Sequence, residues 1–180
     1  NHGVQFFDGT PRFEKKYNCF YHCANLVSAI LPSSINSIGN NAFDRCTSLV
    51  SVSIPNSVTG IGEYAFYQCY SLQTITIPES VNNIGNSAFL YCNALRSVTI
   101  LGTINSIDNH AFHECKNLYD IFYFGDSTPT VVTGSNASFK SCPATIYVKA
   151  DFTPVYFYVW DSNNNTPVNG DWPGKEISAT

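Results

Sequence analysis

Cys19, His22 and Cys23 are the first residues of this sequence whose types could do chemistry, because thiolates and imidazoles bind Zn²⁺ and thiolates act as nucleophiles. A structural zinc site needs four converging ligands, and no second cluster of Cys and His accompanies these three residues. We therefore expect Cys19 and Cys23 to pack within the structure and to bind no metal.

His110, His113 and Glu114 form a second candidate group, suited by type to acid–base or metal chemistry. Three residues with this spacing occupy one short turn, where such side chains are usually solvated. The sequence also offers no nucleophile with a neighbouring base, no carboxylate pair in a catalytic context and no phosphate-binding loop. We predict that the chain is not an enzyme and that it uses no cofactor or metal.

The other cysteines reveal how the chain is organised, because Cys23 is followed by four more at intervals of 23 residues. A Phe stands three places before each of them, and further apolar residues recur with the same period. In the clearest unit the apolar positions are Leu72, Ile75, Ile77, Val81, Ile84, Ala88, Phe89 and Cys92. A fixed period of this length indicates a solenoid, in which each unit stacks on the next.

Each unit is expected to contain one short strand, a turn and a short helical segment. Residues 75–77 alternate with period two, as a strand does, and Pro78 ends the strand. Gly85 then allows a turn with positive φ, and the apolar residues of 88–92 have the three-to-four spacing of one helical face. The predicted fold class is therefore α/β: a solenoid with a parallel sheet of short strands on one side and short helical segments on the other.

Stacking also bears on the state of the repeated thiols. Equivalent residues in adjacent layers are about 4.8 Å apart, whereas the Cβ atoms of a disulfide are usually about 3.5–4.5 Å apart. The chain has seven Cys, an odd number. We predict that Cys46, Cys69, Cys92 and Cys115 are buried free thiols.

The consensus of the units, Leu-x-x-Ile-x-Ile-Pro-x-Ser-Val-x-x-Ile-Gly-x-x-Ala-Phe-x-x-Cys, resembles the BspA-like leucine-rich repeat, also called the Treponema pallidum type. The resemblance covers about residues 17–149 and implies a right-handed leucine-rich repeat solenoid. Similar proteins are mostly secreted or surface proteins of host-associated bacteria and some protists, where they serve adhesion and host-protein binding. The family brings no catalytic residues with it.

Amino-acid composition limits the classes of partner that the chain is expected to bind. A net charge of −4 with nine Lys and Arg gives no footprint for nucleic acid or anionic lipid, so we expect neither as a partner. The sequence has no run of about 18 apolar residues, so we expect no membrane insertion by this chain. The low charged fraction, 12%, fits an extracellular or cell-surface location.

Two segments flank the predicted repeats of residues 17–149. Residues 1–16 are predicted to form an N-terminal cap, since terminal units of solenoids are usually atypical. Residues 150–180 are predicted to form a small β-rich tail, because the period stops and aromatic residues alternate with others there.

The tail carries a second resemblance. Its order Tyr-x-Tyr-x-Trp-Asp, followed by Trp-Pro-Gly, is similar to the opening of starch-binding modules of carbohydrate-binding family 26. This resemblance implies that Tyr156, Tyr158 and Trp172 form an aromatic platform for α-glucan and that Trp160 belongs to the core. The residues themselves equally allow a β-hairpin cap that covers the last repeat.

Exposed side chains supply the remaining candidates. Outward rows of Ser and Thr along the strands end in Asp120 and Phe122, and they either merely suit a parallel sheet or form a binding surface. Four tyrosines near the predicted helical side either fill the stack or form an exposed cluster of a type favoured at interfaces: Tyr64, Tyr67, Tyr70 and Tyr91. The candidate binding residues are Tyr67, Tyr70, Phe122, Tyr156, Tyr158 and Trp172.

We hypothesise a non-catalytic cell-surface or secreted binding or adhesion protein. Its repeats would be a rigid scaffold for protein–protein contacts with extracellular host or neighbouring-cell proteins. The alternative is carbohydrate binding, with α-glucan held by the aromatic tail and the repeats acting as a spacer.

Overall fold

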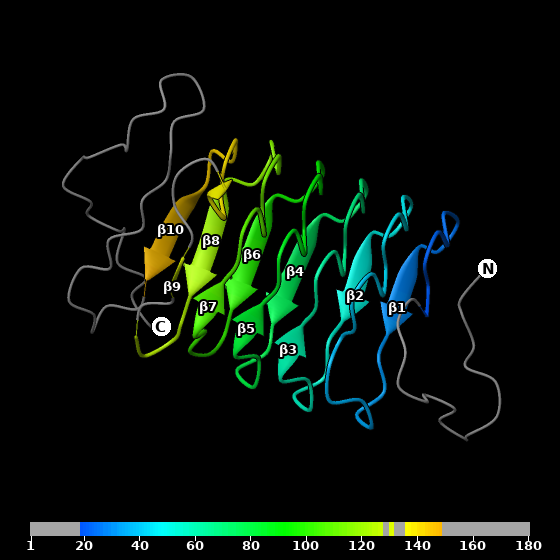
Figure 1. Ribbon diagram of the computed structural model, residues 1–180, viewed down its shortest axis with the longest axis horizontal. Coiled ribbons are helices and arrows are strands. Elements are labelled where there is room, and N and C mark those ends of the chain that lie inside the picture. Colours follow the sequence, from blue (N-terminus) through cyan, green and yellow to red (C-terminus); the bar gives the residue numbers. More distant parts are fainter. Residues whose placement is uncertain (1–18, 128–129, 132–135, 149–180) are drawn as a thin grey trace, which may run out of the picture.

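The structure is a computed structural model that describes residues 19–127, 130–131 and 136–148. The chain winds through successive turns that stack side by side along one axis, with β1 near one end and β10 at the other (Figure 1). The predicted cap (1–16) and tail (150–180) lie outside the described residues. The described part contains no helix that is long and apolar enough to cross a membrane.

All the paired strands are parallel and form three sheets, ordered β1-β2, β10-β8-β6-β4 and β3-β5-β7-β9. The strands are β1 (Ser28–Ile30), β2 (Ser51–Ser53), β3 (Gly60–Ile61), β4 (Thr74–Ile77), β5 (Asn83–Ile84), β6 (Ser97–Ile100), β7 (Ser106–Ile107), β8 (Asp120–Tyr123), β9 (Thr130–Val131) and β10 (Thr145–Val148).

The pairing register reproduces the sequence period. Thr74 in β4 is opposite Ser97 in β6, and Ser97 is opposite Asp120 in β8, so each partner lies 23 residues further along the chain. Because strand side chains alternate between faces, the register places equivalent residues of every unit on the same face. The predicted outward row is confirmed in β4, where Thr74 and Thr76 are exposed and Ile75 and Ile77 are buried.

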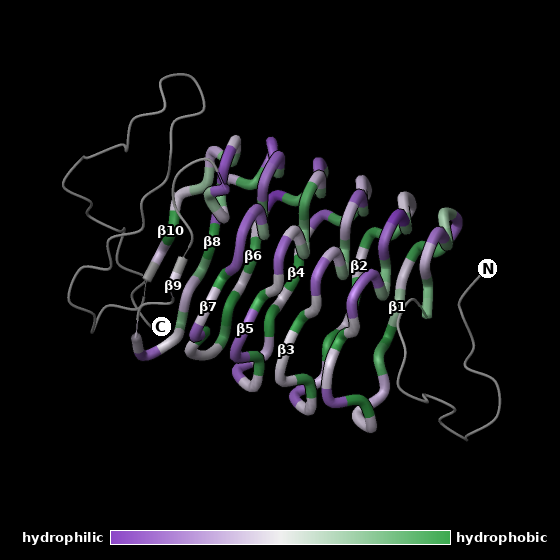
Figure 2. Tube along the Cα trace, viewed as in Figure 1, coloured by the Kyte–Doolittle hydropathy of each residue, from purple (hydrophilic) through white to green (hydrophobic). Residues whose placement is uncertain are grey.

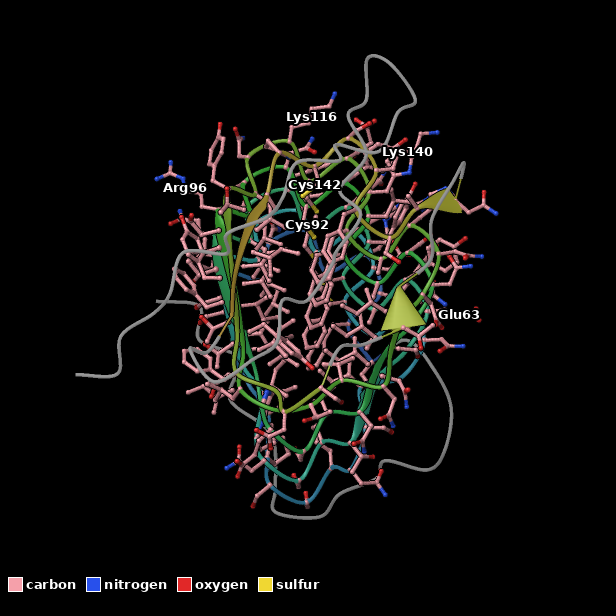
Figure 3. All side chains as sticks on the ribbon, turned by 90° about the vertical axis from the view of Figure 1, so that its left-hand side faces the viewer. Glu63, Cys92, Arg96, Lys116, Lys140 and Cys142 are labelled. Atoms are coloured by element: carbon pink, nitrogen blue, oxygen red, sulfur yellow. The ribbon has the colours of Figure 1, made fainter. Side chains whose placement is uncertain are left out.

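A second ladder of two-residue strands, β3, β5, β7 and β9, lies on the opposite wall of the stack, and the sequence analysis did not predict it (Figure 3). It pairs Ile61 with Ile84 and Ile84 with Ile107, each buried. Two residues give too little alternation to be recognised as a strand. The recurrence of Ile at one position of each unit is the available signal.

The predicted helical segments are wrong, because this part of each unit consists of turns. Phe89 N–H donates to Ala111 O in the next layer at 2.7 Å, whereas Cys92 N–H donates to Phe89 O at 3.1 Å within its own turn. Left-handed backbone at Ser87 (φ 55°) and Tyr91 (φ 65°) alternates the direction of successive N–H groups. An α-helix would instead direct them all to carbonyls four residues back. The described residues contain no α-helix, so the fold is a parallel β-solenoid.

The repeated Gly before these turns also has another role than predicted. Neither Gly62 nor Gly85 has a left-handed φ. A Cβ on Gly85 would lie 2.9 Å from the backbone nitrogen of Glu63, so Gly avoids a close contact between adjacent layers at this position. Asp108 occupies this position in the next unit and keeps the bond between layers, from its N–H to Ile84 O at 3.0 Å.

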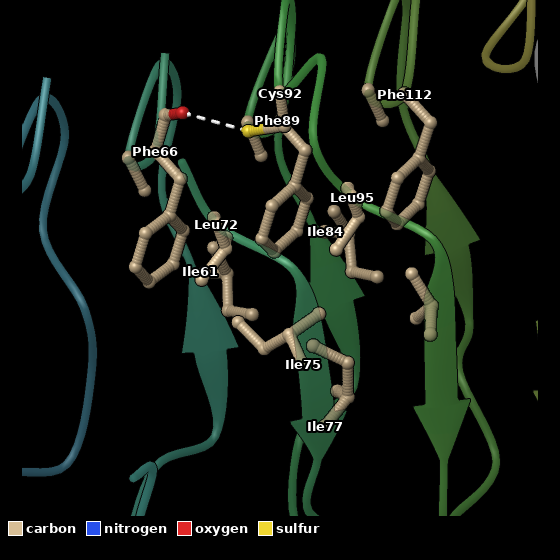
Figure 4. Packing of buried hydrophobic residues seen from close by; sticks show 14 of the residues in the cluster. Ile61, Phe66, Leu72, Ile75, Ile77, Ile84, Phe89, Cys92, Leu95 and Phe112 are labelled. Atoms are coloured by element: carbon tan, nitrogen blue, oxygen red, sulfur yellow. Dashed lines mark hydrogen bonds between the residues drawn. The ribbon is translucent and has the colours of Figure 1, made fainter. Parts of the chain in front are cut away.

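The apolar positions converge into one continuous core between the walls. The eight positions of the unit from Leu72 to Cys92 are each 3% exposed or less, as the sequence predicted. Apolar stretches recur at the same place in successive turns (Figure 2). Adjacent Phe rings stack with centroids 4.9–5.2 Å apart (Figure 4), in a column formed by Phe20, Phe43, Phe66, Phe89, Phe112 and Phe139.

The repeated cysteines line this column as free thiols, as predicted. Cys92 Sγ donates to Phe66 O in the preceding layer at 3.1 Å, and Cys69 and Cys115 make the equivalent bond at the same distance (Figure 4). Burial raises the pKa of Cys46 to about 12. The thiols therefore tie layers together as neutral donors. Cys19 and Cys23, expected to pack, are exposed in the described part of the chain.

Candidate binding surface

The turns that precede each repeated Cys form one edge of the stack, which we call the turn edge. It comprises residues 20–23, 39–46, 62–69, 85–92 and 108–115. Backbone N–H groups along this edge are used within and between layers, for example from Tyr64 N–H to Asn86 O at 3.0 Å. A ligand at the turn edge therefore meets mainly side chains, and their identity determines what can bind.

Tyr64 and Tyr91 occupy turn-edge positions with left-handed backbone, at φ 54° and 65°. Bulky residues rarely adopt this conformation, whereas Asn does so at lower cost. Asn41 stands in the position of Tyr64 in the preceding layer. The two Tyr residues are 38% and 36% exposed, so more than a third of each remains open to a ligand. Both positions therefore combine a backbone cost with an exposed aromatic surface.

Tyr67 joins these two residues into one group, the tyrosine cluster of Tyr64, Tyr67 and Tyr91. The Tyr67 ring meets Tyr64 edge-on, with centroids 5.6 Å apart and planes at 90°, and meets Tyr91 with centroids 6.0 Å apart and planes at 61°. Burial raises the pKa of Tyr67, although Arg45 opposes this effect. The cluster thus presents aromatic edges and faces together with neutral hydroxyl donors.

Arg45 extends this surface toward the N-terminal end, and sequence reasoning missed it. Its guanidinium lies 5.8 Å from the centre of the Tyr67 ring. The same group donates to Tyr21 Oη at 3.3 Å and to Gln68 Oε1 at 3.2 Å, and its Nη1 is 2.7 Å from His22 Nε2. Arg45 thus contacts side chains of both neighbouring layers.

Asp44 lies beneath Arg45 and offsets its charge. The residue is 6% exposed, and its Oδ1 is 3.8 Å from Arg45 Nε. Within the described structure that oxygen accepts no hydrogen bond. Burial raises the pKa of Asp44, while Arg45 and His22 act to lower it. The pair leaves this part of the turn edge with little net charge.

The predicted candidates Tyr67, Tyr70 and Phe122 fall on different parts of the molecule. Tyr70 is 40% exposed one residue after the turn edge ends. Phe122 is on the outward side of β8 and stacks on Tyr147 of β10, with centroids 5.1 Å apart and planes at 18°. Each ring of this pair covers one face of the other. The structure therefore joins Tyr67 to the tyrosine cluster, not to Phe122, and Tyr147 is a partner that the sequence analysis missed.

The other candidates, Tyr156, Tyr158 and Trp172, lie outside the described residues. Their assignment to an α-glucan platform stays a prediction, as does the alternative of a hairpin cap.

The second chemical candidate group is a network of polar contacts at the C-terminal part of the turn edge. The His110 and His113 rings are 4.9 Å apart, and Glu114 lies 3.4 Å from His113 Nε2 and 3.1 Å from Lys116 Nζ. Burial acts to raise the pKa of Glu114, but hydrogen bonds from Lys116 and Ser141 outweigh it and the pKa falls below its ordinary value. Across the described ranges, no group of three or more His, Cys, Asp or Glu could hold a metal ion.

Together the parallel register, the buried Leu and Ile rows and the Phe column define a leucine-rich repeat solenoid. The sequence model described as "BspA type Leucine rich repeat region (6 copies)" matches residues 15–146. The chain therefore belongs to the BspA-type leucine-rich repeat family. No curated protein shows significant sequence similarity to it.

Solved structures of bacterial leucine-rich repeat proteins share the fold. A Treponema pallidum leucine-rich repeat protein is 27% identical with a TM-score of 0.53, and the match covers 69% of this chain and 67% of that one. One from Eubacterium ventriosum is 22% identical with a TM-score of 0.59, over 68% of this chain and 32% of that one.

A leucine-rich cell surface protein from Faecalibacterium prausnitzii is 26% identical with a TM-score of 0.47, over 59% of this chain and 38% of that one. The chain thus spans about a third of the length of the Faecalibacterium and Eubacterium proteins.

Proposed function

We propose that this chain is a non-catalytic binding protein, located outside the cell or on its surface, and that the turn edge is where it contacts a partner protein. The observation that carries this proposal is the placement of Tyr64 and Tyr91, exposed, at left-handed positions where Asn would cost less. The extracellular location rests on family membership.

The chemistry of the tyrosine cluster favours a protein partner. Tyr side chains are enriched among the residues that dominate protein interfaces, because they combine a large contact area with a polar tip and few rotatable bonds. The solenoid beneath the cluster holds the rings through the stacked core, so little ordering cost remains to be met on binding. Contacts between the three rings fix their mutual angles.

The test uses the chain labelled with a fluorophore and applied to cultured epithelial cells. The variant Tyr64→Asn/Tyr91→Asn removes the two exposed rings but suits the left-handed backbone, so it should fold at least as stably as the parent. Tyr119→Asn is the matched control, since Tyr119 is 53% exposed away from the turn edge.

We expect the parent and the Tyr119 variant to bind the cells and the double variant to bind at least roughly tenfold more weakly, the loss of about 1.4 kcal/mol that one interface hot spot supplies. Trypsin treatment of the cells should abolish binding, and amylase treatment should not. Equal binding of the parent and the double variant, or binding that survives trypsin, would contradict the proposal.

A further inference from the structure

We infer that the partner segment recognised at the turn edge is an extended proline-rich peptide in the polyproline II conformation. This inference rests on the function proposed above and names the chemistry of the partner. It is carried by the spacing of the aromatic side chains along the edge and by the way the backbone hydrogen bonds are used.

The spacing follows from the repeat. Tyr21, Tyr67 and His113 each stand two residues before a repeated Cys, and each is separated from the next by two units. Neighbouring layers of the Phe column are 4.9–5.2 Å apart. A ring on every second layer therefore recurs at about 10 Å, close to the distance of about 9.3 Å that three residues cover in polyproline II.

The side chains around Tyr67 suit proline rings. Tyr67 is half-buried, while Tyr64 and Tyr91 are exposed and their rings stand at 90° and 61° to it. Rings held at these angles present both faces and edges to a ligand, and aromatic-lined surfaces accept proline-rich peptides in known recognition of such segments. The arrangement suits a compact apolar ring better than a flat sugar, which stacks on one open aromatic face.

Hydrogen bonding favours the same conformation. Polyproline II has no internal hydrogen bonds, so its carbonyl groups need donors from the partner. The tyrosine hydroxyls and the amide of Gln68 can supply such donors. A peptide bound as an added β-strand would need free backbone groups instead, and the turn edge uses its backbone N–H groups between layers, as from Phe66 to Ala88 O at 2.7 Å.

Charge is compatible with this partner. Arg45 is the cation next to the cluster, Asp44 lies 3.8 Å from its Nε, and the exposed Glu63 stands beside Tyr64. The side chains of a proline-rich segment carry no charge, so they meet no repulsion from either sign here.

The experiment measures binding of fluorescein-labelled decaproline to the full chain by fluorescence polarisation, with a Gly-Ser peptide of equal length as control. We expect decaproline to bind and the Gly-Ser peptide to show no saturable binding. The Tyr64→Asn/Tyr91→Asn variant should bind decaproline at least tenfold more weakly, while Tyr119→Asn should bind like the parent. Far-UV circular dichroism and a thermal melt establish that each variant is folded.

Peptides of different length test the spacing argument directly. A tripeptide of proline reaches one aromatic position, whereas decaproline reaches several, so the longer peptide should bind more tightly. Tyr21→Ser should remove part of that gain for decaproline and leave tripeptide binding unchanged. If decaproline and triproline bind equally, or if Tyr21→Ser has no effect on either, the spacing argument is wrong.

The outcomes separate the two proposals. Cell binding that depends on Tyr64 and Tyr91, together with no binding of decaproline, would overturn the proline-rich partner and leave the binding function in place. If the double variant binds both the cells and decaproline as well as the parent does, both proposals are overturned.

Discussion

Phe89→Ala tests the central claim about what holds the stack together. The Phe89 ring is fully buried, and it is stacked between Phe66 at 5.0 Å and Phe112 at 4.9 Å. Removing it leaves a cavity bounded by both neighbours, and it leaves the Cys115 thiol bonded to the Phe89 carbonyl of a loosened layer.

The expected loss is about 3–5 kcal/mol, the usual range for truncation of a buried Phe. Phe20→Ala provides a matched comparison, because Phe20 is half-buried and its ring stacks on Phe43 at 4.9 Å at the end of the described column. With one stacking neighbour and incomplete burial, its truncation should cost about half as much.

Thermal and urea unfolding followed by far-UV circular dichroism measure the difference. For a chain of this size, 1 kcal/mol corresponds to about 2–4 °C, so Phe89→Ala should lower Tm by about 6–20 °C. Gln73→Ala, at an exposed position, should change Tm by less than about 2 °C. If Phe89→Ala shifts Tm no more than Phe20→Ala or Gln73→Ala, the ring is not the central member of the column.

Three further predictions follow from the same geometry. Gly85→Ala should lower the free energy of unfolding by about 1–3 kcal/mol because its Cβ would meet Glu63 N at 2.9 Å. Gly60→Ala, whose Cβ would have nothing within 4 Å, should be neutral or stabilising. Equal urea midpoints for the two variants would refute this contrast. Iodoacetamide at pH 8 should modify Cys19 and Cys23 in the native protein and all seven thiols in urea, and mass spectrometry identifies the modified residues. Modification of Cys92 in the native protein would contradict its burial. Burial raises the pKa of Cys46 to about 12, so the stability that this neutral thiol contributes is complete below its ordinary pKa and is lost as the pH rises toward 12. Urea midpoints at pH 8 and pH 10 should therefore differ less in Cys46→Ala than in the parent.

The core and register could be predicted from the sequence because both depend on one repeated pattern. A residue such as Leu72 has equivalents every 23 positions, and only stacked layers bury all of them. The turn geometry could not be predicted in this way. Left-handed backbone occurs at Arg45, Tyr64 and Glu114, none of which favours it by type. Contacts between layers impose that conformation, so no local propensity reports it.

The candidate surface was predicted only in part for a related reason. The sequence suggested the grouping of Tyr67 with Tyr64 and Tyr91, but the angles between their rings depend on turns that a helix would have arranged differently. Arg45 belongs to the surface through contacts with residues 23 or 24 positions away, to Gln68 and Tyr21. Such contacts join adjacent layers, and they become visible only once the register of the turn edge is known.

Repetition itself separates the residues that fold this chain from those that give it a partner. A position filled alike in every layer, such as Phe89 or Cys92 and their equivalents, is accounted for by the column that they build. A position filled differently in every layer is free of that demand. Tyr64 departs from its neighbours at a backbone conformation that penalises it, and 38% of its surface stays exposed. In a solenoid, an unrepeated, exposed aromatic residue at a position with a backbone cost is therefore a structural indication of a binding role.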